Sequence, residues 1–299
     1  MKKKNLGMLT GILISATGIV QSGLLSYEGF DYTAGEALTN GTTGINGGTG
    51  WNSPWFRDYS GGNIRYITNG IASVGTATFS GQTVSPYTPI GQTFDADANS
   101  ERGIREWAAS TGDSNSFSAG TSGSADEMWI SLLVNKGPNS GDFLAVNLFG
   151  GDQSSTANLA LKFGQSGQYV TLENGNIINR NFSAVSVDTD YFVLLKLSSD
   201  VNSRDVRVQS AAYDDVTNVP SVEGGIAWDL DGTHTFVSDI NLNAIGLQGS
   251  ITSGGNVLAD ELRIGDGFSD IAVIPEPSSL SLLGMALGTL VLFWRKFRS

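Results

Sequence analysis

The middle of the chain consists of short apolar runs separated by Gly, Asn, Asp and Ser, and no long segment there has helical spacing. Runs of four to eight residues rich in β-branched and aromatic side chains predict β-strands. We expect strands at residues 127–134, 143–149, 159–163, 169–172, 191–197, 205–208, 240–245 and 257–264. Short strands without intervening helices favour antiparallel sheets, and 299 residues suffice to stack two of them. The expected fold class is all-β, a two-sheet antiparallel β-sandwich.

Three local patterns refine this expectation. Asn174-Gly175 is the favoured pair for a tight hairpin, because both residues tolerate positive φ. In residues 205–209 the two valines alternate with polar side chains, so one face of that strand is expected to meet water. Residues 192–195 are apolar on both faces, which predicts a central strand.

The first residues have the features of a secretory signal peptide. Three lysines follow Met1, and an apolar stretch from Leu6 to Val20 follows them. Val20 and Ser22 are suitable at the two positions that a signal peptidase inspects, so cleavage is expected near Ser22 or Gly23. We assign residues 1–23 to the signal peptide. The alternative is a retained membrane anchor, although the run is short for a span.

The last residues combine a rigid motif, an apolar helix and a basic end. Pro275, Glu276 and Pro277 precede seventeen mostly apolar residues, 278–294, which reach roughly across a hydrocarbon core as a helix. Arg295, Lys296 and Arg298 follow and are expected to stay in the cytoplasm. The sequence thus predicts a single C-terminal transmembrane helix with the preceding domain outside the cytoplasm. An ordinary C-terminal anchor is the alternative interpretation.

This C-terminal pattern, residues 274–299, closely resembles the PEP-CTERM sorting signal. The resemblance implies processing near Pro275-Glu276-Pro277 by an exosortase, a membrane cysteine transpeptidase. It also implies an exported protein that passes through an inner-membrane intermediate to the cell envelope, cell surface or extracellular matrix. Signal peptidase, exosortase and the inner membrane are therefore the expected partners. Bacteria with this system usually make exopolysaccharide and biofilm matrix, so polysaccharide is a candidate partner as well.

Composition excludes several classes of protein. The absence of Cys excludes disulfides, thiolate nucleophiles and cysteine-ligated metal clusters, and a single histidine, His234, excludes sites that need two imidazoles. The formal net charge of −12 argues against a nucleic-acid partner, which selects for a basic face.

Residues 24–273 are similar to PEP-CTERM proteins that carry a concanavalin A-like, or laminin G-like, jelly roll. The similarity rests on the opening segment 25–32, the turn 47–51, the strand 129–134 and the closing segment 260–265. It implies two curved antiparallel sheets in which the first and last segments pair. It also implies a lectin-like domain, although one fold hosts many functions.

Calcium is a candidate ligand of an acidic segment. Asp95, Asp97 and Asn99 place oxygen atoms at alternate positions, and Glu106 falls at the twelfth place, as in an EF-hand-like loop. Ser100 stands where such a loop has glycine, and no helix signal flanks the segment. A solvated acidic turn is the alternative, and no cofactor is required.

Trp51 and Trp55 lie in a loop rich in Gly and Pro and are candidates for stacking on a sugar ring. Their alternative role is to anchor the loop or the core. The Glu-x-Asp-x-x-Glu spacing of jelly-roll glycosidases does not occur, so we expect no enzyme. The expected function is a sorted surface or matrix protein with a candidate glycan-binding sandwich. A polysaccharide hydrolase or lyase on this scaffold and a purely structural matrix protein are the alternatives.

Overall fold

The computed structural model describes residues 23–30, 46–57, 66–69, 78–79, 82–83, 92–96, 102–108, 114–123, 126–135, 137, 139, 141–150, 157–164, 167–172, 177–181, 186–187, 189–250 and 257–271. Residues 1–22 of the signal peptide, Pro275-Glu276-Pro277, the apolar tail and its basic end lie outside these ranges. Among the residues described, no helix is both long and apolar enough to pass through a membrane.

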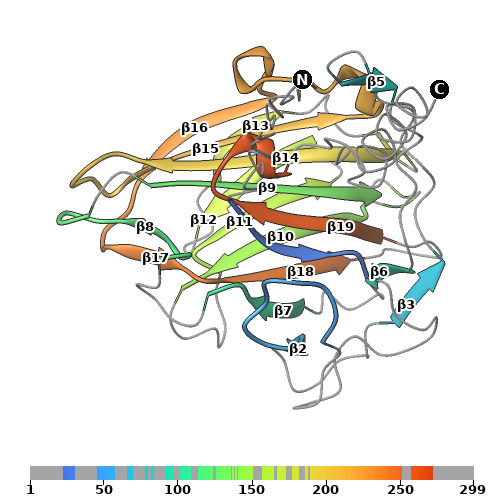
Figure 1. The fold of residues 1–299 in the computed structure, drawn as a ribbon, viewed down its shortest axis with the longest axis horizontal. Coiled ribbons are helices and arrows are strands. Elements are labelled where there is room, and N and C mark those ends of the chain that lie inside the picture. Colours follow the sequence, from blue (N-terminus) through green and yellow to red (C-terminus); the bar gives the residue numbers. More distant parts are fainter. Residues whose placement is uncertain are drawn as a thin grey trace, which may run out of the picture.

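Two antiparallel sheets form the sandwich (Figure 1). The first, sheet A, has its strands in the order β16 (Leu230–Thr235), β15 (Asp205–Tyr213), β14 (Asp190–Ser199), β9 (Asp126–Asn135), β19 (Val257–Gly265), β6 (Gln92–Ala96) and β3 (Tyr66–Asn69), and β1 (Leu24–Glu28) also pairs with β19. The second, sheet B, has the order β13 (Ile177–Asn181), β12 (Gly167–Leu172), β11 (Leu159–Gly164), β10 (Phe143–Phe149), β18 (Ala244–Ser250), β7 (Arg102–Glu106) and β2 (Phe56–Arg57).

Smaller elements complete the described part of the chain. Two strand pairs stand apart from the main sheets, and three short helical turns lie in the connections. They are β17 (Ile240–Leu242) with β8 (Phe117–Ala119), β4 (Thr78–Phe79) with β5 (Gln82–Thr83), the 3-10 turns η1 (Val216–Asn218) and η2 (Glu223–Gly225), and α1 (Phe268–Ile271).

Alternation along the strands places the main core between the sheets. In β9, Ile130 and Leu132 join the main cluster of buried apolar residues, whereas Trp129 and Leu133 belong to a second cluster. Successive side chains of a strand point to opposite faces, so this second cluster covers the outer face of sheet A. Each large apolar side chain contributes about 1.5–3 kcal/mol when it is buried, so both faces of β9 stabilise the fold.

The last strand of sheet A changes its neighbour halfway along. On one edge, β19 pairs with β6 through residues 257–259 and with β1 through residues 262–265. The change coincides with a bulge between Asp260 and Arg263, where Glu261 adopts a positive φ of 51°. A bulge bends a strand and redirects its side chains, and here it lets two strands share one edge.

The all-β sandwich of antiparallel sheets predicted from the sequence is confirmed. Each expected strand overlaps an observed one, and β1 pairs with β19 as the resemblance implied. The β12–β13 hairpin is present, although its turn lies outside the described residues. The strand expected at 240–245 is in fact two, because the backbone of Asn243 bonds to Trp107 and Phe149 instead of continuing one ladder.

Candidate functional site

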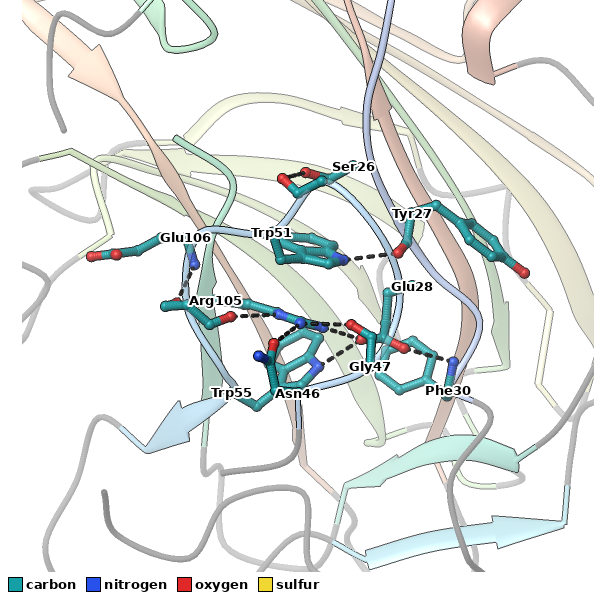
Figure 2. Close-up of polar contacts among 12 residues, drawn as sticks. Ser26, Tyr27, Glu28, Phe30, Asn46, Gly47, Trp51, Trp55, Arg105 and Glu106 are labelled. Carbon is teal, nitrogen blue, oxygen red and sulfur yellow. Dashed lines mark hydrogen bonds and ion pairs between the residues drawn. The ribbon is translucent and has the colours of Figure 1, made fainter. Parts of the chain in front are cut away.

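A buried ion pair connects the two sheets next to the predicted sugar-binding loop (Figure 2). Glu28, at the end of β1, accepts hydrogen bonds from the Arg105 guanidinium on β7 and from Trp55 Nε1, the latter at 3.0 Å. Its other oxygen accepts the backbone N–H of Phe30 at 2.9 Å. The side chains of Glu28 and Arg105 are each 1% exposed. We call Glu28, Trp55 and Arg105 the inter-sheet cluster.

Arg105 also holds the loop that follows residue 45. Its Nε donates to Ser53 O at 2.9 Å, and its Nη2 donates to Asn46 Oδ1 at 2.6 Å and to Gly47 O at 2.7 Å. The guanidinium lies 4.7 Å from the centre of the Trp51 ring, which is within cation–π range. A buried charge with this many partners stabilises one loop conformation, which is a structural role.

Glycines allow this loop to approach β1 closely. Residues 27 and 49 exchange two backbone hydrogen bonds of 2.9 Å. Gly48 and Gly50 have φ of 69° and 76°, and a Cβ on Gly50 would lie 1.9 Å from Leu25 O. No other residue type fits at position 50 without moving the backbone, because any side chain would collide with the strand.

The structure separates the roles of the two candidate stacking residues. Trp55 is completely buried and stacks against Phe30 with ring centres 5.7 Å apart, so its ring offers no face to a sugar. In this conformation Trp55 anchors the loop and the core, which is the alternative role considered in the sequence analysis. Trp51 is partly buried and donates from Nε1 to Tyr27 O at 2.8 Å. Trp51 therefore stays a candidate for ligand contact, and Trp55 does not.

The structure describes two of the four candidate calcium ligands, and these two lie in different sheets. Asp95 lies in β6 of sheet A, and Glu106 ends β7 of sheet B, while Asp97 and Asn99 lie outside the described residues. Strand β7 rises about 3.3 Å per residue, which carries Glu106 roughly 13 Å away from the loop end at Arg102. Among the described residues no group of three or more His, Asp or Glu could hold a metal ion.

A second group of acids lies at the β19 bulge. Tyr27 donates from its hydroxyl to both oxygens of Glu261, at 3.0 and 2.9 Å. Asp260 is fully buried; one of its oxygens accepts the Glu261 backbone N–H at 2.8 Å, and the other has no hydrogen-bond partner among the residues that the structure describes. Burial, reinforced by Glu261, raises the pKa of Asp260 to about 8, so its carboxyl is protonated at neutral pH.

The short helix α1 packs against the outer face of sheet A. The ring of Phe268 lies 5.3 Å from that of Trp129 on β9, and Ser131 Oγ donates to Ile271 O at 2.8 Å. Ile271 has no exposed surface. The fold therefore holds the chain firmly up to residue 271, four residues before Pro275.

Sequence reasoning missed the inter-sheet cluster and the acids at the bulge. Glu28 and Arg105 are charged residues, and charge normally indicates a solvated position. The segment 102–106 contains a single apolar residue, Ile104, so nothing marked it as a strand. One usable signal was the pair of tryptophans beside a Gly-rich turn, since a buried indole N–H needs an acceptor.

Comparison with known families finds the PEP-CTERM protein-sorting motif over residues 273–299. The C-terminus of this chain therefore carries a PEP-CTERM sorting signal, as the residues 274–299 indicated. The matched segment begins two residues after the buried end of α1. No curated protein matches the chain.

Several of the solved structures similar to this chain are lectins or have a galectin-like fold. A galectin-like protein of unknown function from Bacillus subtilis shares 8% identity over 58% of this chain and 82% of its own, with a TM-score of 0.36. The VIP36 exoplasmic/lumenal domain, bound to Ca²⁺ and Man3GlcNAc, shares 10% sequence identity over 65% of this chain and 84% of its own, with a TM-score of 0.36. Lectin UEA-II complexed with galactose shares 7% sequence identity over 61% of this chain and 89% of its own, with a TM-score of 0.35. Because these sequence identities and TM-scores are low, we assign the β-sandwich from the strand pairing of this chain itself.

Proposed function

We propose that this protein is a substrate of an exosortase, which delivers the β-sandwich to the cell surface or the extracellular matrix. The observation that carries the proposal is the PEP-CTERM motif at residues 273–299, which begins two residues after the end of α1. Export begins with the predicted signal peptide, and the C-terminal apolar helix then retains the protein at the inner membrane. Exosortase cleaves near Pro275-Glu276-Pro277 and releases the sandwich from that helix.

The place where the fold ends supports this order of events. Ile271 is buried against β9, and only residues 272–274 separate it from Pro275. An extended residue spans at most about 3.6 Å, so the processing motif lies within roughly 15 Å of the sandwich. The folded domain must therefore sit close to the membrane while the tail is still attached.

The mass of the mature protein tests the proposal. Cells with and without the exosortase should yield proteins that differ by the mass of the segment after the cleavage site. Replacing Glu276 by Ala should give the uncleaved mass in both strains, whereas Asp214→Ala, at an exposed position in the sandwich, should leave processing unchanged. Identical masses in the two strains would rule out exosortase processing.

We propose further that the delivered domain is concanavalin A-like and contacts a neutral glycan near Trp51. The ring of Trp51 is partly exposed, and the guanidinium of Arg105 lies at 4.7 Å from it, so its orientation is fixed before any ligand arrives. Retention on neutral polysaccharide columns, with and without calcium, tests this proposal. Trp51→Ala should abolish retention. If the wild-type domain is retained on none of the columns, glycan binding is ruled out and a purely structural matrix role is the remaining proposal.

A hydrolase or lyase is the alternative proposal for the same scaffold. It needs two carboxylates on opposite sides of a substrate, about 5–10 Å apart. Incubation of the secreted protein with soluble neutral and acidic polysaccharides, followed by reducing-end and unsaturated-product assays, decides between binding and turnover.

A further inference from the structure

Two carboxyl groups pack against the same side of Gly23 at the edge of sheet A. A Cβ built on this glycine would be 2.2 Å from Asp266 Oδ1 and 2.2 Å from Asp270 Oδ2. Because that Cβ would be one bond from Cα, both oxygens lie within roughly 4 Å of the Gly23 Cα. The backbone is fixed there as well, since the Asp266 N–H donates to Gly23 O at 3.1 Å.

The carboxyl groups of Asp266 and Asp270 are hydrogen-bonded to each other, and a positive charge beside them would stabilise the charged form of both. Asp270 is only 8% exposed, and its burial together with the Asp266 carboxylate raises its pKa to about 6. A hydrogen bond from the backbone N–H of Gly267 favours its charged form. Within the described part of the chain no Lys, Arg or His forms an ion pair with either acid, and Arg263 on the neighbouring strand is paired with Glu261 instead.

We propose that signal-peptide cleavage falls after Ser22, one residue before the boundary at residue 23 assigned above, and that Asp266 and Asp270 bind the α-amino group that it creates on Gly23; the inference rests on the signal peptide of the proposed function. Hydrolysis of the Ser22–Gly23 peptide bond consumes one water and leaves a carboxylate on Ser22 and an ammonium on Gly23. Before cleavage the same nitrogen belongs to an uncharged amide, which does little to offset the mutual repulsion of the two carboxylates. After cleavage the nitrogen is mostly protonated at neutral pH, and it lies one bond from the Cα that both carboxyl groups approach from one side.

This contact would join the two processed ends of the domain. Asp270 belongs to α1, which ends four residues before Pro275, and under this proposal Gly23 is the first residue of the mature chain. Removal of the signal peptide would thus fix α1 more firmly against sheet A. The N-terminal cleavage would in this way define the position of the C-terminal sorting motif.

The reactivity of the N-terminal amine tests the proposal. The full chain is exported in a host that lacks exosortase, extracted in detergent, and acylated with a small N-hydroxysuccinimide ester at pH 7.5. Mass spectrometry should find a mature N-terminus at Gly23 whose acylation is slow, because the acids hold the amine in its protonated form. Asp266→Asn and Asp270→Asn should each accelerate acylation, by about tenfold for every unit by which the amine pKa falls.

Matched controls separate this role from a merely structural one. Asp214→Asn removes an exposed carboxylate elsewhere and should leave the acylation rate unchanged. Ser22→Phe places a large side chain at the cleavage position and keeps the precursor intact; there, Asp266→Asn should not lower Tm, whereas in the cleaved protein it should lower Tm by roughly 2–4 °C. A mature N-terminus at another residue, unchanged acylation rates, or equal Tm losses in both forms would each overturn the proposal.

Discussion

Glu28 on β1 and Arg105 on β7 form a buried ion pair that links the first strand of the described chain to the opposite sheet. Their carboxylate and guanidinium are almost fully removed from water, and Trp55 donates a further hydrogen bond to the same carboxylate. Desolvation makes such a pair costly to break, because removal of one partner leaves the other charge buried and uncompensated. The sheet-to-sheet arrangement therefore depends on these two residues.

Arg105→Met should destabilise the sandwich by about 3–5 kcal/mol, since it removes the Arg105 charge from beside the buried Glu28 carboxylate. The matched control is Arg204→Met, which removes the surface pair with Asp239 and should cost about 0–1 kcal/mol. Urea unfolding followed by tryptophan fluorescence measures both. Equal losses in the two variants would contradict the role of the inter-sheet cluster.

Asp260 should make the stability of the domain depend on pH. Its folded pKa of about 8 exceeds the unfolded value near 4, so the native state binds more protons than the unfolded state between these limits. The free energy of unfolding should therefore fall as pH rises from about 4 to 8 and level off above. Asp260→Asn keeps an acceptor for the Glu261 N–H and should remove this part of the slope, whereas Asp200→Asn, at an exposed position, should not. Melting temperatures across this range measure the effect, and parallel curves for wild type and Asp260→Asn would contradict it.

Gly50→Ala should destabilise the domain by more than about 1 kcal/mol, because a Cβ at a φ of 76° would collide with Leu25 O. Gly224→Ala is the matched control: nothing lies within 4 Å of a Cβ there, so the change should stay within about 0.5 kcal/mol. Urea midpoints of the two variants test the close approach of the loop to β1.

The strands that the sequence predicted are those whose side chains alternate or are apolar on both faces. Val206 and Val208 are buried while Arg207 between them is exposed, and Phe192 and Val193 pack on opposite faces of sheet A. In these segments the local pattern and the tertiary environment agree, so a short window of sequence carries the information.

The burial of Trp55 could not be read in the same way, because its environment is set by residues far away in the sequence. Glu28 and Arg105 meet its indole from two different sheets. Likewise, Asp260 alternates like a polar outward-facing residue, yet the bulge and the shared edge of β19 bury it completely. The burial of Trp55 and of Asp260 depends on contacts between strands that are distant in the sequence, and the periodicity of a single sequence does not predict such contacts.

Phe268→Ala should loosen α1 from sheet A, because it removes the ring that lies 5.3 Å from Trp129. Phe268 is partly buried, so the loss should be below the 3–5 kcal/mol typical of a fully buried Phe→Ala change, at about 1–3 kcal/mol. Amide hydrogen exchange at residues 268–271 should accelerate accordingly, while exchange in β14 stays unchanged because that strand keeps its neighbours on both sides. Val237→Ala, at a side chain 90% exposed, should alter neither. If exchange near Ile271 is already fast in the wild type, α1 does not hold the chain against the sandwich, and the sorting motif is free of the domain that precedes it.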